Sequence, residues 1–193
     1  MSEFDIFWRR HFGNLPPRPP AFPWWENWVR FHYLPQSKCY ADNAEELATT
    51  IHRFASVANA VLGDDAPCWI SAVNWSEDDL ARNEMKAIGE AIFPISLQYA
   101  GKYPDILNID DEDHRDFEIH AAQVTWRLRP FEKLLGLIGE GKIEGNATWT
   151  RIDKPVIFYP YCGGMDLYLR SGDEVMKLRE EFSAWLSPRP DGL

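Results

Sequence analysis

Residues 43–75, NAEELATTIHRFASVANAVLGDDAPCWISAVNW, decide the fold class because a long helical pattern is followed at once by a strand-like run. The apolar residues of the helical part, 43–62, recur at the helical period and form one stripe: Leu47, Ile51, Phe54, Ala55, Ala58 and Leu62. We expect Asp42 to cap this helix, with Glu45 completing a capping box, and Gly63 to end it. The short apolar run 68–75 is typical of a buried strand.

The rest of the chain alternates between helix-like and strand-like segments. Helices are predicted at 3–12, after Ser76, near Pro130 and at 173–186, and strands at 24–34, 92–103, 117–126, 147–151, 155–159 and 165–169. The prolines between positions 16 and 23 predict an extended connector, because proline fixes φ and lacks an amide donor.

This order of elements indicates an α/β or α+β fold, with a mixed or mainly antiparallel sheet packed against about four to five helices. The 193 residues favour a single domain over two. We expect 1–23 to form an N-terminal helix and a Pro-rich connector, and 24–193 to form the core. The pattern leaves the order of the strands open.

Charge and aromatic content bear on the kind of partner. The formal net charge is −10, from 30 acidic and 20 basic residues, and no basic patch is visible in the sequence. Such a negative field repels nucleic acid and anionic membranes and attracts basic partners, so we expect neither a nucleic-acid nor a membrane partner. The chain has nine Trp, and Trp is common both in cores and in binding surfaces.

Three widely separated cysteines, Cys39, Cys68 and Cys162, do not form a disulfide framework and suit a reducing compartment. The first residues lack the basic and apolar regions of a signal peptide, and no apolar run reaches the roughly 20 residues that span a bilayer. We therefore expect a cytoplasmic protein.

The common cofactor and metal motifs are not matched. A phosphate-binding loop needs clustered glycines between a strand and a helix, whereas Gly139 and Gly141 follow a helix and Gly163 and Gly164 precede a strand. Zinc sites need closely spaced Cys or His pairs, and the acidic stretch lacks the glycine of a calcium loop. We expect no cofactor and no metal.

A thiol nucleophile is the best enzyme candidate. Cys162 lies in a glycine-containing turn, where a thiolate would be accessible, and His120 or His52 would serve as the base. A small hydrolase or transferase that uses Cys162 or a carboxylate pair is therefore the alternative reading. Because an unreactive turn cysteine explains the pattern equally simply, the preferred prediction is that the protein is not an enzyme.

An acidic stretch is the feature that best suits a partner. We expect partner binding by a set of seven residues: Tyr103, Asp105, Asp110, Asp111, Glu112, Asp113 and Asp116. The carboxylates would attract a basic protein, and neighbouring aromatic residues, Tyr99, Phe117 and Trp126, would serve as apolar anchors. The alternative is a solvated loop. A third hypothesis, an interaction module, relies on the Pro-rich segment or on self-association, which stays open.

The segment 159–186 carries a motif of structural residues: Tyr161, Gly163, Gly164, Asp166 and Trp185. We expect Gly164 to permit a turn, Asp166 to bond the amides of that turn, and Trp185 to seal the last helix against the sheet. Through Tyr161, Gly164, Asp166, Trp185 and Leu186 the segment resembles the C-terminal motif of a bacterial family of unknown function associated with Rhs-type polymorphic toxin loci. It departs from that motif in the turn, where the family has more acidic residues, and at Ala184, where Asp is common.

The resemblance implies a role beside toxins and their immunity proteins. An immunity protein is a small cytoplasmic domain that blocks a toxin and needs no catalysis, and such inhibitors are often acidic. We therefore expect a non-catalytic immunity or inhibitor protein whose partner is a cognate toxin domain.

Overall fold

The computed structural model describes residues 1–18, 26–75, 79–104 and 116–187. In this part of the chain, five α-helices and two short 3-10 turns accompany one seven-stranded sheet. The helices are α1 (Glu3–Phe12), α2 (Ala44–Leu62), α3 (Asp79–Ala91), α4 (Leu128–Gly139) and α5 (Gly172–Glu181), and the 3-10 turns are Pro35–Ser37 and Ser183–Trp185.

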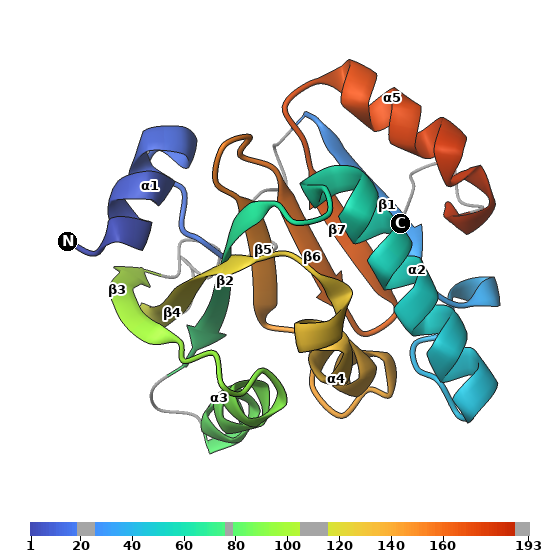
Figure 1. Ribbon diagram of the computed structural model, residues 1–193, viewed down its shortest axis with the longest axis horizontal. Helices are drawn as coiled ribbons and strands as arrows, with labels where there is room; N and C mark the ends of the chain where they lie inside the picture. The colour runs from blue at the N-terminus through green and yellow to red at the C-terminus, as the bar shows by residue number, and fades with distance from the viewer. Residues whose placement is uncertain (19–25, 76–78, 105–115, 188–193) are drawn as a thin grey trace.

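The strands are β1 (Trp28–His32), β2 (Pro67–Asn74), β3 (Gln98–Pro104), β4 (Asp116–Thr125), β5 (Ala147–Arg151), β6 (Ile157–Tyr161) and β7 (Gly164–Tyr168). They lie in the order β1-β7-β6-β5-β2-β4-β3, and each neighbouring pair is antiparallel. The fold is thus α+β with an antiparallel sheet and five helices, as the sequence predicts. The strand β1, early in the chain, pairs with β7 near its end (Figure 1).

The sheet separates two apolar cores. Alternate residues of one strand point to opposite faces, so in β2 Cys68 and Ile70 join the core under α2, α3, α4 and α5, while Trp69 faces α1. The core on the α1 side contains Phe4, Trp8 and Phe12 of that helix. Figure 1 shows α1 apart from the other four helices, beside β3 and β4.

Sequence periodicity places α2 and β4 well. In α2, Phe54, Ala55, Ala58 and Leu62 of the predicted stripe are buried, and Gly63 ends the helix at a φ of +85°. In β4 the predicted alternation also holds, since Phe117, Ile119 and Ala121 are buried.

The cap of α2 is shifted by one residue from the prediction. Asn43, not Asp42, is the N-cap, and its side-chain oxygen accepts from the Glu46 amide at 2.9 Å. The carboxylate that completes the box is that of Glu46, not Glu45, and it accepts from the Asp42 amide at 2.8 Å. Asp42 and Asn43 both suit an N-cap, and a glutamate follows each of them three residues later. The sequence alone therefore does not distinguish the two possible caps.

Candidate functional site

The turn between β6 and β7 requires its two glycines. Gly163 has a φ of +101°, a conformation that L side chains rarely adopt. A Cβ at Gly164 would lie 2.7 Å from the carbonyl oxygen of Phe31 in β1. The prediction that Gly164 permits the turn is therefore sharpened: Gly163 supplies the conformation, and Gly164 allows β1 to approach closely.

Behind this turn, Asp166 pairs with Arg30. The two residues are register partners on β7 and β1, and Arg30 donates from Nε at 2.8 Å and from Nη2 at 3.0 Å to the two carboxylate oxygens. The Tyr161 hydroxyl donates to Asp166 Oδ1 at 3.1 Å, and Asp166 is only 3% exposed. Contrary to the prediction, Asp166 therefore does not bond the amides of the turn in the described contacts. It instead accepts two charge-assisted hydrogen bonds from β1, the neighbouring strand in the sheet but far away in the sequence.

Aromatic rings enclose this ion pair. The Arg30 guanidinium carbon lies 5.2 Å from the ring centre of Trp28 and 5.4 Å from that of Tyr161. The hydrogen bonds that Arg30 donates to Asp166 raise the pKa of Arg30, and burial raises the pKa values of Tyr161 and Tyr168. The arginine therefore stays charged and the phenols stay protonated at neutral pH, which makes the cluster a stabilising feature of the sheet.

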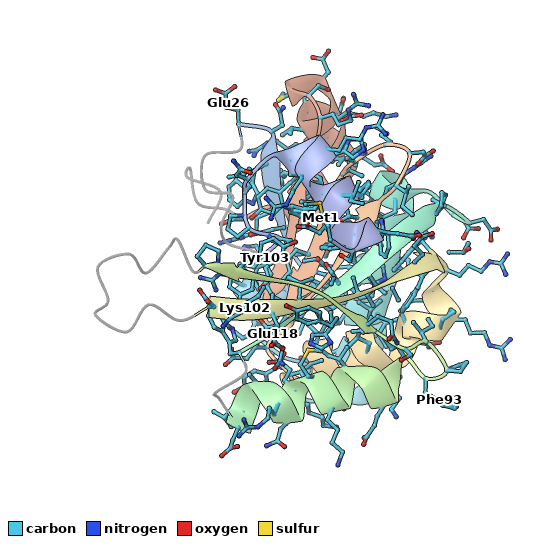
Figure 2. The ribbon with its side chains drawn as sticks, turned by 90° about the vertical axis from the view of Figure 1, so that its left-hand side faces the viewer. Met1, Glu26, Phe93, Lys102, Tyr103 and Glu118 are labelled. Atoms are coloured by element: carbon cyan, nitrogen blue, oxygen red, sulfur yellow. The ribbon has the colours of Figure 1, made fainter. Side chains whose placement is uncertain are left out.

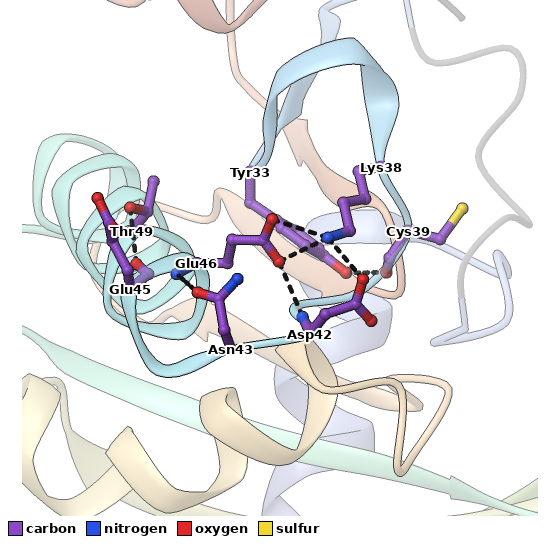
Figure 3. A network of polar contacts seen from close by, with 8 residues as sticks. All are labelled: Tyr33, Lys38, Cys39, Asp42, Asn43, Glu45, Glu46 and Thr49. Carbon is purple, nitrogen blue, oxygen red and sulfur yellow. Dashed lines mark hydrogen bonds and ion pairs between the residues drawn. The ribbon is translucent and has the colours of Figure 1, made fainter.

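A second set of contacts joins the turn to the loop before α2. The buried Tyr33 hydroxyl accepts from the Gly163 amide at 2.8 Å and donates to the Cys39 carbonyl oxygen (Figure 3). The Cys162 thiol donates to the same carbonyl oxygen at 2.9 Å. His32 lies beside them, with Nδ1 at 3.2 Å from the Gly163 carbonyl oxygen. Three residues that no sequence pattern groups together thus lie in and around this turn beside Cys162: Tyr33, Cys39 and His32.

The same loop is fixed to α2 by an ion-pair network, also drawn in Figure 3. Lys38 Nζ lies 2.8 Å from Asp42 Oδ2 and 2.6 Å from Glu46 Oε2. The hydrogen bond from Lys38, followed by that from the Asp42 amide, lowers the pKa of Glu46 below its ordinary value. Glu46 therefore combines the capping of α2 with the anchoring of Lys38.

Replacement of Glu46 by Gln is expected to reduce stability in a pH-dependent way. Since the folded-state pKa is lower than the unfolded value of 4.5, the carboxylate stabilises the fold above that value and stops doing so as the pH falls through the folded pKa. Denaturant midpoints of wild type and Glu46→Gln should differ at pH 7 and converge in acid. Glu45→Gln, at the neighbouring position outside the network, is the control, and an equal effect there would contradict the assignment.

The bases suggested for Cys162 contact other groups. His120 lies on β4, on the face opposite Phe117, and its Nε2 lies 3.5 Å from Oε2 of Glu118. The His52 ring lies 6.4 Å from that of Trp185. Burial raises the pKa of the Cys162 thiol, which lowers the thiolate fraction at neutral pH. The described contacts therefore give Cys162 a backbone carbonyl as its partner instead of either predicted base.

Trp185 lies in the 3-10 turn that follows α5. It stacks on Phe182 at a centroid distance of 4.9 Å, lies 5.0 Å from the Arg53 guanidinium of α2, and packs, partly buried, against the main core. Phe182 contacts the sheet directly, because its ring lies 5.6 Å from that of Phe31 in β1.

The predicted partner-binding residues fall at the β3–β4 hairpin, which occupies one edge of the sheet. Asp105 and the run 110–113 lie outside the described residues. Asp116, the first residue of β4, is half-exposed and pairs with Lys102 at 3.1 Å. Figure 2 looks onto this hairpin, with Lys102, Tyr103 and Glu118 on adjacent strands.

Tyr103 is not an exposed anchor. It is 7% exposed, its hydroxyl donates to Asp5 at 2.7 Å, and its ring stacks on Phe117. Phe117 and Trp126 are fully buried as well, so the notion of apolar anchors holds only for Tyr99, which is 57% exposed. The alternation of apolar residues in β4 already predicts that Phe117 is buried. The sequence of β3 shows no such alternation that would reveal which of its faces packs against α1.

A shallow hollow separates this edge strand from the start of α1. It has a volume of about 440 Å³ and is lined by residues of both elements, among them Met1, Arg9, Tyr99 and Lys102. Within the described ranges, no three His, Cys, Asp or Glu side chains gather in a way that would hold a metal ion. None of the helices in those ranges has the length and apolarity to cross a membrane.

The fold and these contacts define an α+β protein with one antiparallel sheet, in which the Arg30–Asp166 pair joins β1 to β7. The family described as a domain of unknown function, DUF3885, matches residues 5–190, and the chain belongs to it. Neither a curated protein nor a solved structure matches this chain.

Proposed function

We propose that this protein is a non-catalytic immunity or inhibitor protein that captures a cognate bacterial toxin domain at the β3–β4 edge of its sheet. The observation that carries the proposal is the position of the acidic segment. Residues 105–115 connect two register partners, Pro104 and Asp116, and therefore begin and end at the tip of the outermost hairpin. Six acidic side chains lie between 105 and 116, against only His114 and Arg115.

The edge strand itself supports binding. In the sheet order, β3 has one neighbour, β4, so its other side presents backbone amide and carbonyl groups that a partner strand can use. Ser2 already uses one of them, since its hydroxyl donates to the Ala100 carbonyl at 2.6 Å. The exposed ring of Tyr99 lies at the start of the same strand and offers apolar area to a partner.

Charge favours a basic partner. A net charge of −10 accelerates encounter with a cationic surface, and six of the acidic residues lie close together in the sequence between β3 and the start of β4. The resemblance of 159–186 to a family linked with Rhs-type toxin loci supports a toxin as that partner. We further propose that the protein acts in the cytoplasm, a compartment in which free thiols such as its three cysteines are common.

Co-expression with the product of the neighbouring toxin gene tests this function. We expect the two proteins to co-purify and cells that express the toxin to survive when this chain is present. Failure of both binding and protection would refute the proposal.

Neutralising the acidic segment is expected to slow capture of that partner. In the triple variant Asp110→Asn, Asp111→Asn, Asp113→Asn, the association rate should fall roughly tenfold at low salt and lose most of its salt dependence. Stopped-flow or surface binding measures this rate. The matched control neutralises three exposed acids on α4 and α5, Glu132, Glu180 and Glu181, with the same change in net charge. Equal slowing by both variants would assign the effect to overall charge and not to the hairpin.

A further inference from the structure

We propose that Cys39 and Cys162 are a thiol-oxidation site, at which a small disulfide such as oxidised glutathione converts the two thiols into an intramolecular disulfide. The two residues are 123 positions apart in sequence, yet the Cys162 sulfur lies 2.9 Å from the carbonyl oxygen of Cys39. This inference does not depend on the proposed function.

The backbones on both sides of the pair are fixed at a short separation. A Cβ built on Gly163, next to Cys162, would lie 3.8 Å from the Cys39 sulfur and 3.9 Å from the Cys39 Cα. The Tyr33 hydroxyl binds both segments, because it accepts from the Gly163 amide at 2.8 Å and donates to the Cys39 carbonyl. Such proximity is what disulfide formation without large backbone movement requires.

The two thiols are also accessible, in contrast to the third. Cys39 is exposed and Cys162 is partly exposed, whereas Cys68 is fully buried in the core. Burial raises the pKa of Cys68 to about 12, so it has almost no thiolate at neutral pH. An oxidant in solution therefore meets Cys39 first, and Cys68 serves as an internal control.

The chemistry is two successive thiol–disulfide exchanges. The Cys39 thiolate attacks one sulfur of oxidised glutathione, forms a mixed disulfide and releases one glutathione thiolate. The Cys162 thiol loses its proton to solvent, and its thiolate attacks the Cys39 sulfur and displaces the second glutathione. The protein loses two hydrogen atoms, and oxidised glutathione is reduced to two molecules of glutathione.

The bond would covalently join two parts of the molecule that hydrogen bonds connect at this point. Cys39 lies between the 3-10 turn Pro35–Ser37 and the start of α2, and Cys162 lies in the β6–β7 turn. A crosslink over so many residues restricts the unfolded chain strongly. We therefore expect the oxidised protein to melt at a higher temperature than the reduced protein by several degrees, and reductant to reverse the change.

The experiment treats the reduced full-length chain with oxidised glutathione. The total number of thiols per chain, titrated in denaturant, should fall from three to one. The intact mass should fall by the mass of two hydrogen atoms, and peptide mapping should identify a disulfide between Cys39 and Cys162. Cys68→Ala should form the same bond. Cys39→Ser and Cys162→Ser should not form it and should instead retain glutathione on the remaining member of the pair.

Three results would overturn the proposal. They are an unchanged count of three thiols, a stable mixed disulfide on Cys39 in the wild-type chain, or disulfide-linked dimers in place of the internal bond. A further variant tests whether the short separation of the two cysteines, and not the reactivity of Cys39, controls the second exchange. Tyr33→Phe removes the hydroxyl that binds both segments. It should slow the second exchange several-fold while leaving the rate of the first exchange unchanged.

Discussion

Replacement of Arg30 by Met is expected to lower the free energy of unfolding by about 3 kcal/mol, because it leaves a buried carboxylate without its counter-charge. The Asp166 side chain is 5% exposed, and Arg30 supplies two of its three described hydrogen bonds. Methionine preserves much of the apolar length of arginine over Trp28, so the loss reports the charge and its hydrogen bonds. Denaturant unfolding followed by Trp fluorescence measures it.

A double variant distinguishes the unpaired charge from lost packing. Arg30→Met combined with Asp166→Leu removes both charges, and most of the stability lost in the single variant should return. Arg30→Lys should recover only part of it, because an ammonium cannot form the two parallel bonds of a guanidinium. A single variant as stable as wild type would show that the pair contributes little to the fold.

Truncation of Trp149 to Ala is expected to cost about 3–5 kcal/mol, the usual range for a large aromatic residue removed from a packed core. Trp149 is fully buried on β5, and its ring lies 5.3 Å from that of Phe131, 5.7 Å from Trp126 and 5.9 Å from Phe158. These rings join β5 and β6 to α4. Removal of Trp149 would therefore open a cavity between the sheet and that helix.

Trp149→Phe is the informative comparison. Among the described residues, the Trp149 Nε1 group is a buried donor with no hydrogen-bond partner, so phenylalanine loses volume but no hydrogen bond. Its cost should be well below that of Trp149→Ala. Trp185→Ala, at a half-buried position in the 3-10 turn that contacts α2, should cost about 1 kcal/mol. Similar losses at Trp149 and Trp185 would contradict the central role of the β5 residue.

Local periodicity accounts for what could be predicted about the fold. The stripe of α2 and the alternation of β4 lie within single elements, so composition at fixed spacing suffices to place them. The order of the strands depends on pairings between distant segments. Nothing in the residues around Trp28 indicates that β1 lies beside β7, more than 130 positions later, and the sequence left that order open.

The site was predictable to a smaller degree, for the same reason. Tyr161, Gly163, Gly164 and Asp166 belong to one hairpin and could be grouped from the sequence, but their main partners could not. Arg30 and Tyr33 come from the other end of the chain, and their one sequence signal is a place in an alternating strand. The buried state of Tyr103 was missed because α1, which supplies Asp5, lies 98 positions away.

The pairing of β1 with β7 has a consequence for how the chain is made. Trp28 of β1 is the register partner of Tyr168 of β7, so within the described sheet β1 gains its neighbour only after more than 130 further residues have been synthesised. The emerging chain must keep an apolar strand with Val29 and Phe31 out of non-native pairing throughout that time. Contacts of such wide sequence separation also slow folding, since a long loop must close before they are gained. The sheet therefore gains its β1 edge only after β7 has been synthesised.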